Sequence, residues 1–136
     1  MKGSITGLAE IVLWSHDLER SFDFYCGIFG LERMEQPEDV KPRFLRVASG
    51  TNGVPHMLVL VPHPDPSGTF PAAKPERPLH HLAFTAAASE YDSLRARCEA
   101  AGHGTRDGVH PVLQGVRTFY VDDPDGNEVE VIARKP

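Results

Sequence analysis

The chain has 136 residues, of which 40% are hydrophobic and 24% are charged, and these ordinary proportions exclude extended disorder. The net charge is −5 and the 14 Lys and Arg residues are scattered, so no basic stripe is available for a nucleic-acid partner. Two cysteines without CxxC spacing, and no apolar run near the ~20 residues of a membrane span, indicate a cytoplasmic protein with reduced thiols and no membrane partner.

The first half of the sequence alternates strand and helix signals. Residues 5–14 favour a strand, and Asp17 then supplies an N-cap for a helix that ends near Gly30. One face of that helix is apolar and carries Leu18, Phe22, Tyr25 and Phe29. Further strands are expected near residues 31–36, 44–48 and 56–61.

A proline-rich stretch separates this half from a second one with the same order of elements. Six prolines fall between residues 62 and 78, and proline removes backbone donors, so we expect an extended linker there. The second half then predicts a strand over 79–85, a helix that Ser89 begins through a capping box, and strands near 104–109, 116–122 and 128–133.

The repeated order of elements predicts an α+β fold made of two βαβββ modules in a single domain over residues 1–136. The first module is expected over residues 5–62 and the second over 79–134, with the linker over 63–78. Because the halves share little sequence, the repeat is one of element order, as in a duplicated unit that has diverged.

Three strand positions carry side chains that bind divalent metals. Glu10 lies inside an apolar strand, His81 opens the corresponding strand of the second half, and Glu130 stands between two valines. The pairs Glu10/His81 and Val59/Glu130 are both 71 residues apart, so these four residues occupy equivalent positions of the duplicated unit. Taken singly, each glutamate is also consistent with an exposed strand residue and His81 with a structural histidine. Together they suggest a metal site.

These residues resemble the vicinal oxygen chelate superfamily, which includes glyoxalase I, bleomycin-resistance proteins, fosfomycin-resistance enzymes and extradiol dioxygenases. The matching stretches are residues 10–31, the run His-Leu-Ala-Phe at 81–84, and residues 119–131. The resemblance implies mixed sheets cupped around a central cavity, with the helices on the outer face. It also implies one divalent metal (Fe, Mn, Zn, Ni or Co) bound by Glu10, His81 and Glu130.

The same resemblance suggests further site residues. Val59 stands where many members of the superfamily have a fourth ligand, and it cannot ligate, so we expect it to line the pocket together with Trp14. Tyr120 falls at the active-site tyrosine of extradiol dioxygenases, and His110 lies near their acid–base histidine. The hairpin register leaves two alternatives open, because pairing residue 122 with 127 turns Phe119 and Arg117 toward the cavity, whereas one extra loop residue turns Tyr120 toward it.

The predicted function is that of a divalent-metal-dependent enzyme acting on a small, oxygen-rich substrate. The metal would chelate two neighbouring substrate oxygens and stabilise an enolate or oxyanion, as in a dioxygenase, lyase, isomerase or transferase. The alternative is a metal-free small-molecule-binding protein of the bleomycin-resistance type. The resemblance further implies a homodimer with shared sites, in which Glu10 comes from one subunit and His81 with Glu130 from the other.

Overall fold

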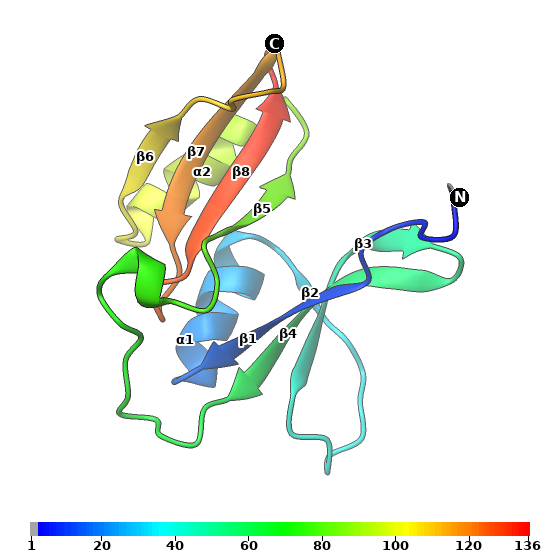
Figure 1. Cartoon of the computed structure of the whole chain (residues 1–136), viewed down its shortest axis with the longest axis vertical. Coiled ribbons are helices and arrows are strands. Elements are labelled where there is room, and N and C mark those ends of the chain that lie inside the picture. Colours follow the sequence, from blue (N-terminus) through cyan, green and yellow to red (C-terminus); the bar gives the residue numbers. More distant parts are fainter. Residues whose placement is uncertain (1–2) are drawn as a thin grey trace. The chain divides into compact units, whose positions relative to one another are not determined.

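The computed structural model describes residues 3–136. The chain divides into two compact units, and the boundary along the chain lies between Gly68 and Thr69. Each unit follows the order β-α-β-β-β, and the first runs from blue to green and the second from green to red in Figure 1. This confirms the prediction of an α+β fold with two modules. The boundary between the units lies inside the proline-rich segment that was predicted to be the linker.

The first unit contains a four-stranded mixed sheet with the strand order β1-β4-β3-β2. β1 is parallel to β4, whereas β3 is antiparallel to both β4 and β2. β1 starts at Glu10, later than predicted, where its pairing with β4 begins. The elements are β1 (Glu10–Ser15), α1 (Leu18–Phe22), the π-helical η1 (Asp23–Ile28), β2 (Glu32–Arg33), β3 (Arg43–Thr51) and β4 (Val54–Pro62).

The helix of the first unit begins and packs as its sequence predicts. The carboxylate of Asp17 accepts a hydrogen bond from the backbone N–H of Arg20 at 3.2 Å, which confirms the N-cap. Phe24 and Tyr25 are fully buried and supply much of the core on this side of the sheet. The strands contribute the other large apolar side chains of this core, which are Leu13, Leu45, Leu58 and Leu60.

The second unit repeats the arrangement, with the strand order β5-β8-β7-β6. Its helix begins at Tyr91 after Glu90, with no side-chain cap, so the capping box predicted at Ser89 is wrong. Within residues 3–136, no helix is long and apolar enough to cross a membrane. The elements are the 3₁₀ helix η2 (Lys74–Glu76), β5 (Leu82–Thr85), α2 (Tyr91–Ala100), β6 (Thr105–Gly108), β7 (Val116–Asp122) and β8 (Glu128–Arg134).

The parallel strand pairs of the two units have the same register. Val12 of β1 pairs with Val59 of β4, and Ala83 of β5 pairs with Glu130 of β8. Both members of the second pair lie 71 residues beyond those of the first, which is the repeat predicted from the sequence. The equivalence of Val59 and Glu130 therefore holds in the hydrogen-bonded sheets themselves.

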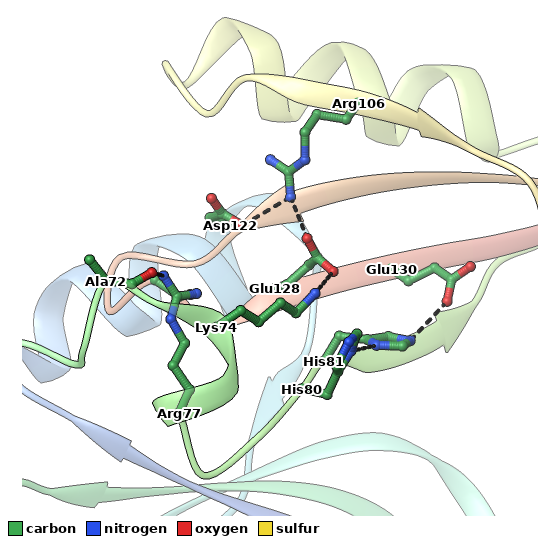
Figure 2. Close-up of polar contacts among 10 residues, drawn as sticks. Ala72, Lys74, Arg77, His80, His81, Arg106, Asp122, Glu128 and Glu130 are labelled. Atoms are coloured by element: carbon green, nitrogen blue, oxygen red, sulfur yellow. Dashed lines mark hydrogen bonds and ion pairs between the residues drawn. The ribbon is translucent and has the colours of Figure 1, made fainter.

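Part of the proline-rich segment is fixed to the second sheet. The guanidinium of Arg77 donates hydrogen bonds to the carbonyl oxygens of Pro71 (2.9 Å), Ala72 (3.2 Å) and Gly126 (2.7 Å). Lys74 forms an ion pair with Glu128 at the start of β8, as Figure 2 shows. These contacts hold residues 71–77 against the β7–β8 hairpin, so this stretch is not a free linker.

Candidate metal centre

A histidine and a buried glutamate face each other on the second sheet. The Nε2 atom of His81, just before β5, lies 3.3 Å from Oε1 of Glu130 on β8, and Figure 2 shows the two side chains directed toward each other. Glu130 is only 4% exposed. Its second oxygen, Oε2, is buried and has no hydrogen-bond partner among the described residues. A buried carboxylate oxygen without a partner is costly unless a cation or donor satisfies it.

The distance between these two donor atoms suits a shared metal ion. Metal–nitrogen and metal–oxygen bonds are each about 2.1 Å long, so tetrahedral or octahedral angles separate two ligand atoms by roughly 3.0–3.4 Å. The separation of 3.3 Å between His81 and Glu130 falls in this range. The free oxygen of Glu130 supplies negative charge for the same ion. The pair therefore fits a divalent metal.

A second group of possible ligands lies beside this pair. Donor atoms of His80, His81 and Glu128 all lie within 4.8 Å of one another. However, Oε1 of Glu128 is paired with Lys74, and Oε2 accepts from Arg106 at 2.9 Å. Burial acts to raise the pKa of Glu128, but the hydrogen bonds from these two cations hold it below its usual value. Since its charge is already neutralised, Glu128 is a poorer metal ligand than Glu130.

The strand register places Tyr120 on the same face as Glu130. Asp122 pairs with Glu128, so the hairpin has the extra loop residue and Tyr120 pairs directly with Glu130. The Tyr120 ring lies 6.1 Å from the ring of His81 in an edge-on orientation. Burial has the largest effect on the pKa of Tyr120 and raises it. The nearby negative charge of the Glu130 carboxylate raises it further. The phenol therefore keeps its proton at neutral pH and is able to donate a hydrogen bond.

The same register turns Phe119 and Arg117 to the opposite face of the sheet, so the prediction that they line the cavity face is corrected. Phe119 is fully buried and packs edge-on against Tyr91 of α2 at 5.2 Å. Arg117 lies 4.0 Å above the same tyrosine ring and pairs with Asp92 at 3.0 Å. Both side chains therefore attach α2 to the sheet.

The turn itself explains this register. The carboxylate of Asp123 accepts hydrogen bonds from the backbone N–H groups of Asp125 and Asn127 at 2.9 and 2.8 Å. The Asn127 side chain donates a third bond to the same carboxylate at 3.0 Å. These bonds stabilise a turn over residues 123–127, one residue longer than the turn that would pair residue 122 with 127.

Gly108 makes room for the Tyr120 ring. It pairs with Thr118 on β7, and a Cβ at this glycine would overlap both Oγ1 of Thr118 and the ring of Tyr120. We therefore expect Gly108→Ala to displace the tyrosine ring from Glu130 and to lower the free energy of unfolding by about 1–3 kcal/mol through overpacking. Chemical denaturation measures the loss. Gly104→Ala is the matched control, because a Cβ there meets nothing within 4 Å, and equal losses in both variants would contradict the prediction.

His110 lies in the loop that follows β6, and its own loop holds its ring. Its Nδ1 accepts hydrogen bonds from the backbone N–H groups of Val112 (3.2 Å) and Leu113 (2.9 Å). The residue lines a hollow of about 410 Å³ together with Val116 and Lys135. Among the described residues, His110 has no hydrogen bond, ion pair or ring contact with His81, Tyr120 or Glu130.

The remaining predicted site residues lie in the first unit. Glu10 and Trp14 are on the exposed face of β1, where Trp14 is 44% exposed, whereas Leu13 is buried. The side chains of β1 therefore alternate between an exposed and a buried face. Val59 is 2% exposed in the middle of β4, between Val12 of β1 and Phe44 of β3.

The chain belongs to the Glyoxalase/Bleomycin resistance protein/Dioxygenase superfamily, whose family model matches residues 7–131. This confirms the resemblance inferred from the motifs. A comparison with curated proteins finds no match to this sequence.

Solved structures with the same fold include enzymes and binding proteins. A glyoxalase/dioxygenase from Nostoc punctiforme is 23% identical with a TM-score of 0.76, covering 100% of this chain and 96% of its own. The fosfomycin resistance protein FosX from Listeria monocytogenes is 26% identical with a TM-score of 0.68, covering 95% and 91%. A point mutant of FosX was solved in complex with Mn(II) and 1S,2S-dihydroxypropylphosphonic acid. TnmS3, an antibiotic binding protein from Streptomyces, is 22% identical with a TM-score of 0.62, covering 98% and 99%.

Proposed function

We propose that this protein is a divalent-metal-dependent enzyme that binds a small substrate through two neighbouring oxygen atoms. His81 and Glu130 are two of the metal ligands, and Glu10 is the third. The observation that carries this proposal is the buried carboxylate of Glu130, with one oxygen unpartnered and the other 3.3 Å from Nε2 of His81. The bound metal would act as a Lewis acid toward substrate oxygens.

The chain's own groups then have separate roles. His81 binds as the neutral imidazole and Glu130 as the carboxylate, since ligands must be deprotonated. Tyr120, protonated near neutral pH because burial and the charge of Glu130 raise its pKa, donates a hydrogen bond to a substrate oxygen or moves a proton there. We assign this role to Tyr120 rather than His110, whose Nδ1 is held by its own loop.

Mn(II) is the ion we favour among Fe, Mn, Zn, Ni and Co. Two glutamates and one histidine form a hard, anionic ligand set that suits Mn(II), and the FosX mutant was solved with this ion. The test is metal analysis of the purified protein, followed by EDTA treatment and melting with each of the five ions. We expect about one ion per chain and a melting temperature that Mn(II) raises and EDTA restores. A metal-free protein whose melting temperature none of these ions changes would refute the proposal.

A metal-free binding protein is the second candidate, because Val59 occupies the fourth ligand position and is buried among apolar residues. The side chains of Trp14 and Val12 are 44% and 51% exposed and form an apolar face of β1. Such a face suits a flat organic ligand. In that case EDTA leaves the melting temperature unchanged, and members of an aromatic small-molecule panel raise it.

We further propose a cytoplasmic location. Cys26 and Cys98 are both free, and burial raises the pKa of Cys98 to about 11, so this thiol is inert. A reducing compartment keeps both residues in this state. Fractionation of the native host tests the location.

We also propose a homodimer with shared sites, in which Glu10 of one protomer joins His81 and Glu130 of the other. Glu10→Gln and Glu130→Gln homodimers then each lose Mn(II). Unfolding and refolding an equal mixture is expected to restore about a quarter of the wild-type metal content, since half the dimers are mixed and each mixed dimer has one intact site. Calorimetric titration with Mn(II) measures this. A strict monomer on size exclusion, or no recovery in the mixture, would contradict the shared site.

A further inference from the structure

One arginine of the first sheet lies on the same face as Glu10. Met57 of β4 pairs with Glu10 of β1 on one side and with Arg46 of β3 on the other, and residues directly opposite each other in a sheet point to the same face. Adjacent strands are roughly 4.8 Å apart, so the backbones of Glu10 and Arg46 are roughly 10 Å apart. Arg46 therefore belongs to the face on which we place the third metal ligand.

The opposite face of the same sheet agrees with this orientation. Leu45 is fully buried, and Arg33, which pairs with Leu45, lies 4.0 Å above the ring of Phe22 in α1. Leu45 therefore faces the helix. Side chains alternate along a strand, and the register shift in β3 comes only after Arg46, so Arg46 points away from the helix.

The guanidinium of Arg46 has no partner within the described chain. Among residues 3–136 it forms no hydrogen bond or ion pair, although Glu32 of β2 is directly opposite it in the sheet. The side chain is half-buried. A guanidinium without a partner presents parallel N–H donors that match the two oxygens of a carboxylate or a phosphate.

An apolar row lies beside Arg46 on this face. Val12, Val59 and Phe44 pair with one another across three strands, and Phe44 is two positions before Arg46. Val12 is 51% exposed and Phe44 is half-buried. A flat ring that lay on this row would bring a substituent at its edge within reach of the guanidinium.

We propose that Arg46 is a specificity-determining residue that selects a flat, anionic ligand. The ring of the ligand lies on the apolar row, and its carboxylate or phosphate pairs with the guanidinium. The inference rests on the proposed function for the choice of this face as the substrate site, and it narrows the substrate class to anions. The pairing itself does not require the metal.

The test uses the metal-free protein and two probes of nearly the same shape, naphthalene-2-carboxylate and naphthalene-2-carboxamide, of which only the first is charged. Calorimetric titration gives both dissociation constants for wild type, Arg46→Gln and Arg43→Gln. Arg43 is the matched control. It lies on the opposite face of the same strand, where it pairs with the buried Leu60, and its guanidinium donates to the carbonyl oxygen of Val40 at 2.8 Å.

We expect wild type and Arg43→Gln to bind the carboxylate roughly 10-fold more tightly than the amide, because hydrogen bonds between charged groups are about twice as strong as neutral ones. In Arg46→Gln we expect the two dissociation constants to agree within about twofold. A preference that persists in Arg46→Gln would overturn the proposal. So would a preference that Arg43→Gln also removes, or a wild type that binds neither probe. If wild type prefers the carboxylate through Arg46 but binds no metal, the proposed function fails and the anion site stands.

Discussion

Glu130→Gln is expected to abolish Mn(II) binding without weakening the metal-free fold. Removing a partner that only orients a metal ligand lowers the metal affinity about 10–100-fold. Removing a ligand itself should therefore lower the Mn(II) affinity at least about 100-fold. Glutamine has nearly the same shape and removes a charge that is 4% exposed and has one unpartnered oxygen. Since burying such a charge opposes folding, the metal-free variant should melt no lower than metal-free wild type. Mn(II) should then stabilise only the wild type.

Glu128→Gln is the matched control two residues away. It breaks the ion pairs with Lys74 and Arg106, so we expect the free energy of unfolding to fall by about 1–2 kcal/mol while Mn(II) binding persists. Melting curves with and without Mn(II) measure both effects. If Glu128→Gln lost the metal and Glu130→Gln kept it, the centre would be the neighbouring group of His80, His81 and Glu128.

Gly50→Ala is expected to be the most destabilising glycine substitution in the first unit. Gly50 has φ of +73°, and a Cβ there would overlap the carbonyl oxygen of Val54 and lie 2.8 Å from Cα of Pro55. Neither backbone atom can move aside as a side chain can. A left-handed conformation costs alanine roughly 1 kcal/mol, and the overlap adds about 1–3 kcal/mol. We therefore expect a loss of roughly 2–4 kcal/mol in chemical denaturation.

Gly53 provides a control for the backbone angle alone. It has a similar φ of +76°, in the Asn52–Gly53 turn between β3 and β4, but a Cβ there meets nothing within 4 Å. Gly53→Ala should therefore cost only about 1 kcal/mol. Equal losses at the two positions would show that the overlap at Gly50 is relieved by movement of the hairpin.

The sequence alone predicted the features that depend on periodicity. The 71-residue spacing placed Glu10, Val59, His81 and Glu130 at equivalent positions, and the parallel registers of the two units agree. A strand period of two is so strict that a register error would have put each of these side chains on the wrong face. This is why the spacing holds in a chain with little internal identity.

Features that depend on turns and long side chains were not predictable in this way. The choice between Tyr120 and Phe119 depended on one residue in the 123–127 turn, which the bonds of Asp123 determine. Glu128 and Glu130 are two positions apart on β8, and each has a partner on the same side of the strand. A spacing of two residues predicts a shared face of the strand. The cations that neutralise Glu128, however, are Lys74 and Arg106, and both come from distant segments of the sequence.

The position of the boundary inside the proline-rich segment has a practical consequence for splitting the protein. The turn that Asp65 forms with Ser67 lies wholly before Gly68, and the bonds of Arg77 lie wholly after it. A break in the backbone after Gly68 would therefore leave every one of these bonds intact. Each fragment would keep a complete four-stranded sheet and its helix, which makes this peptide bond the natural place to divide the chain for co-expression of its halves.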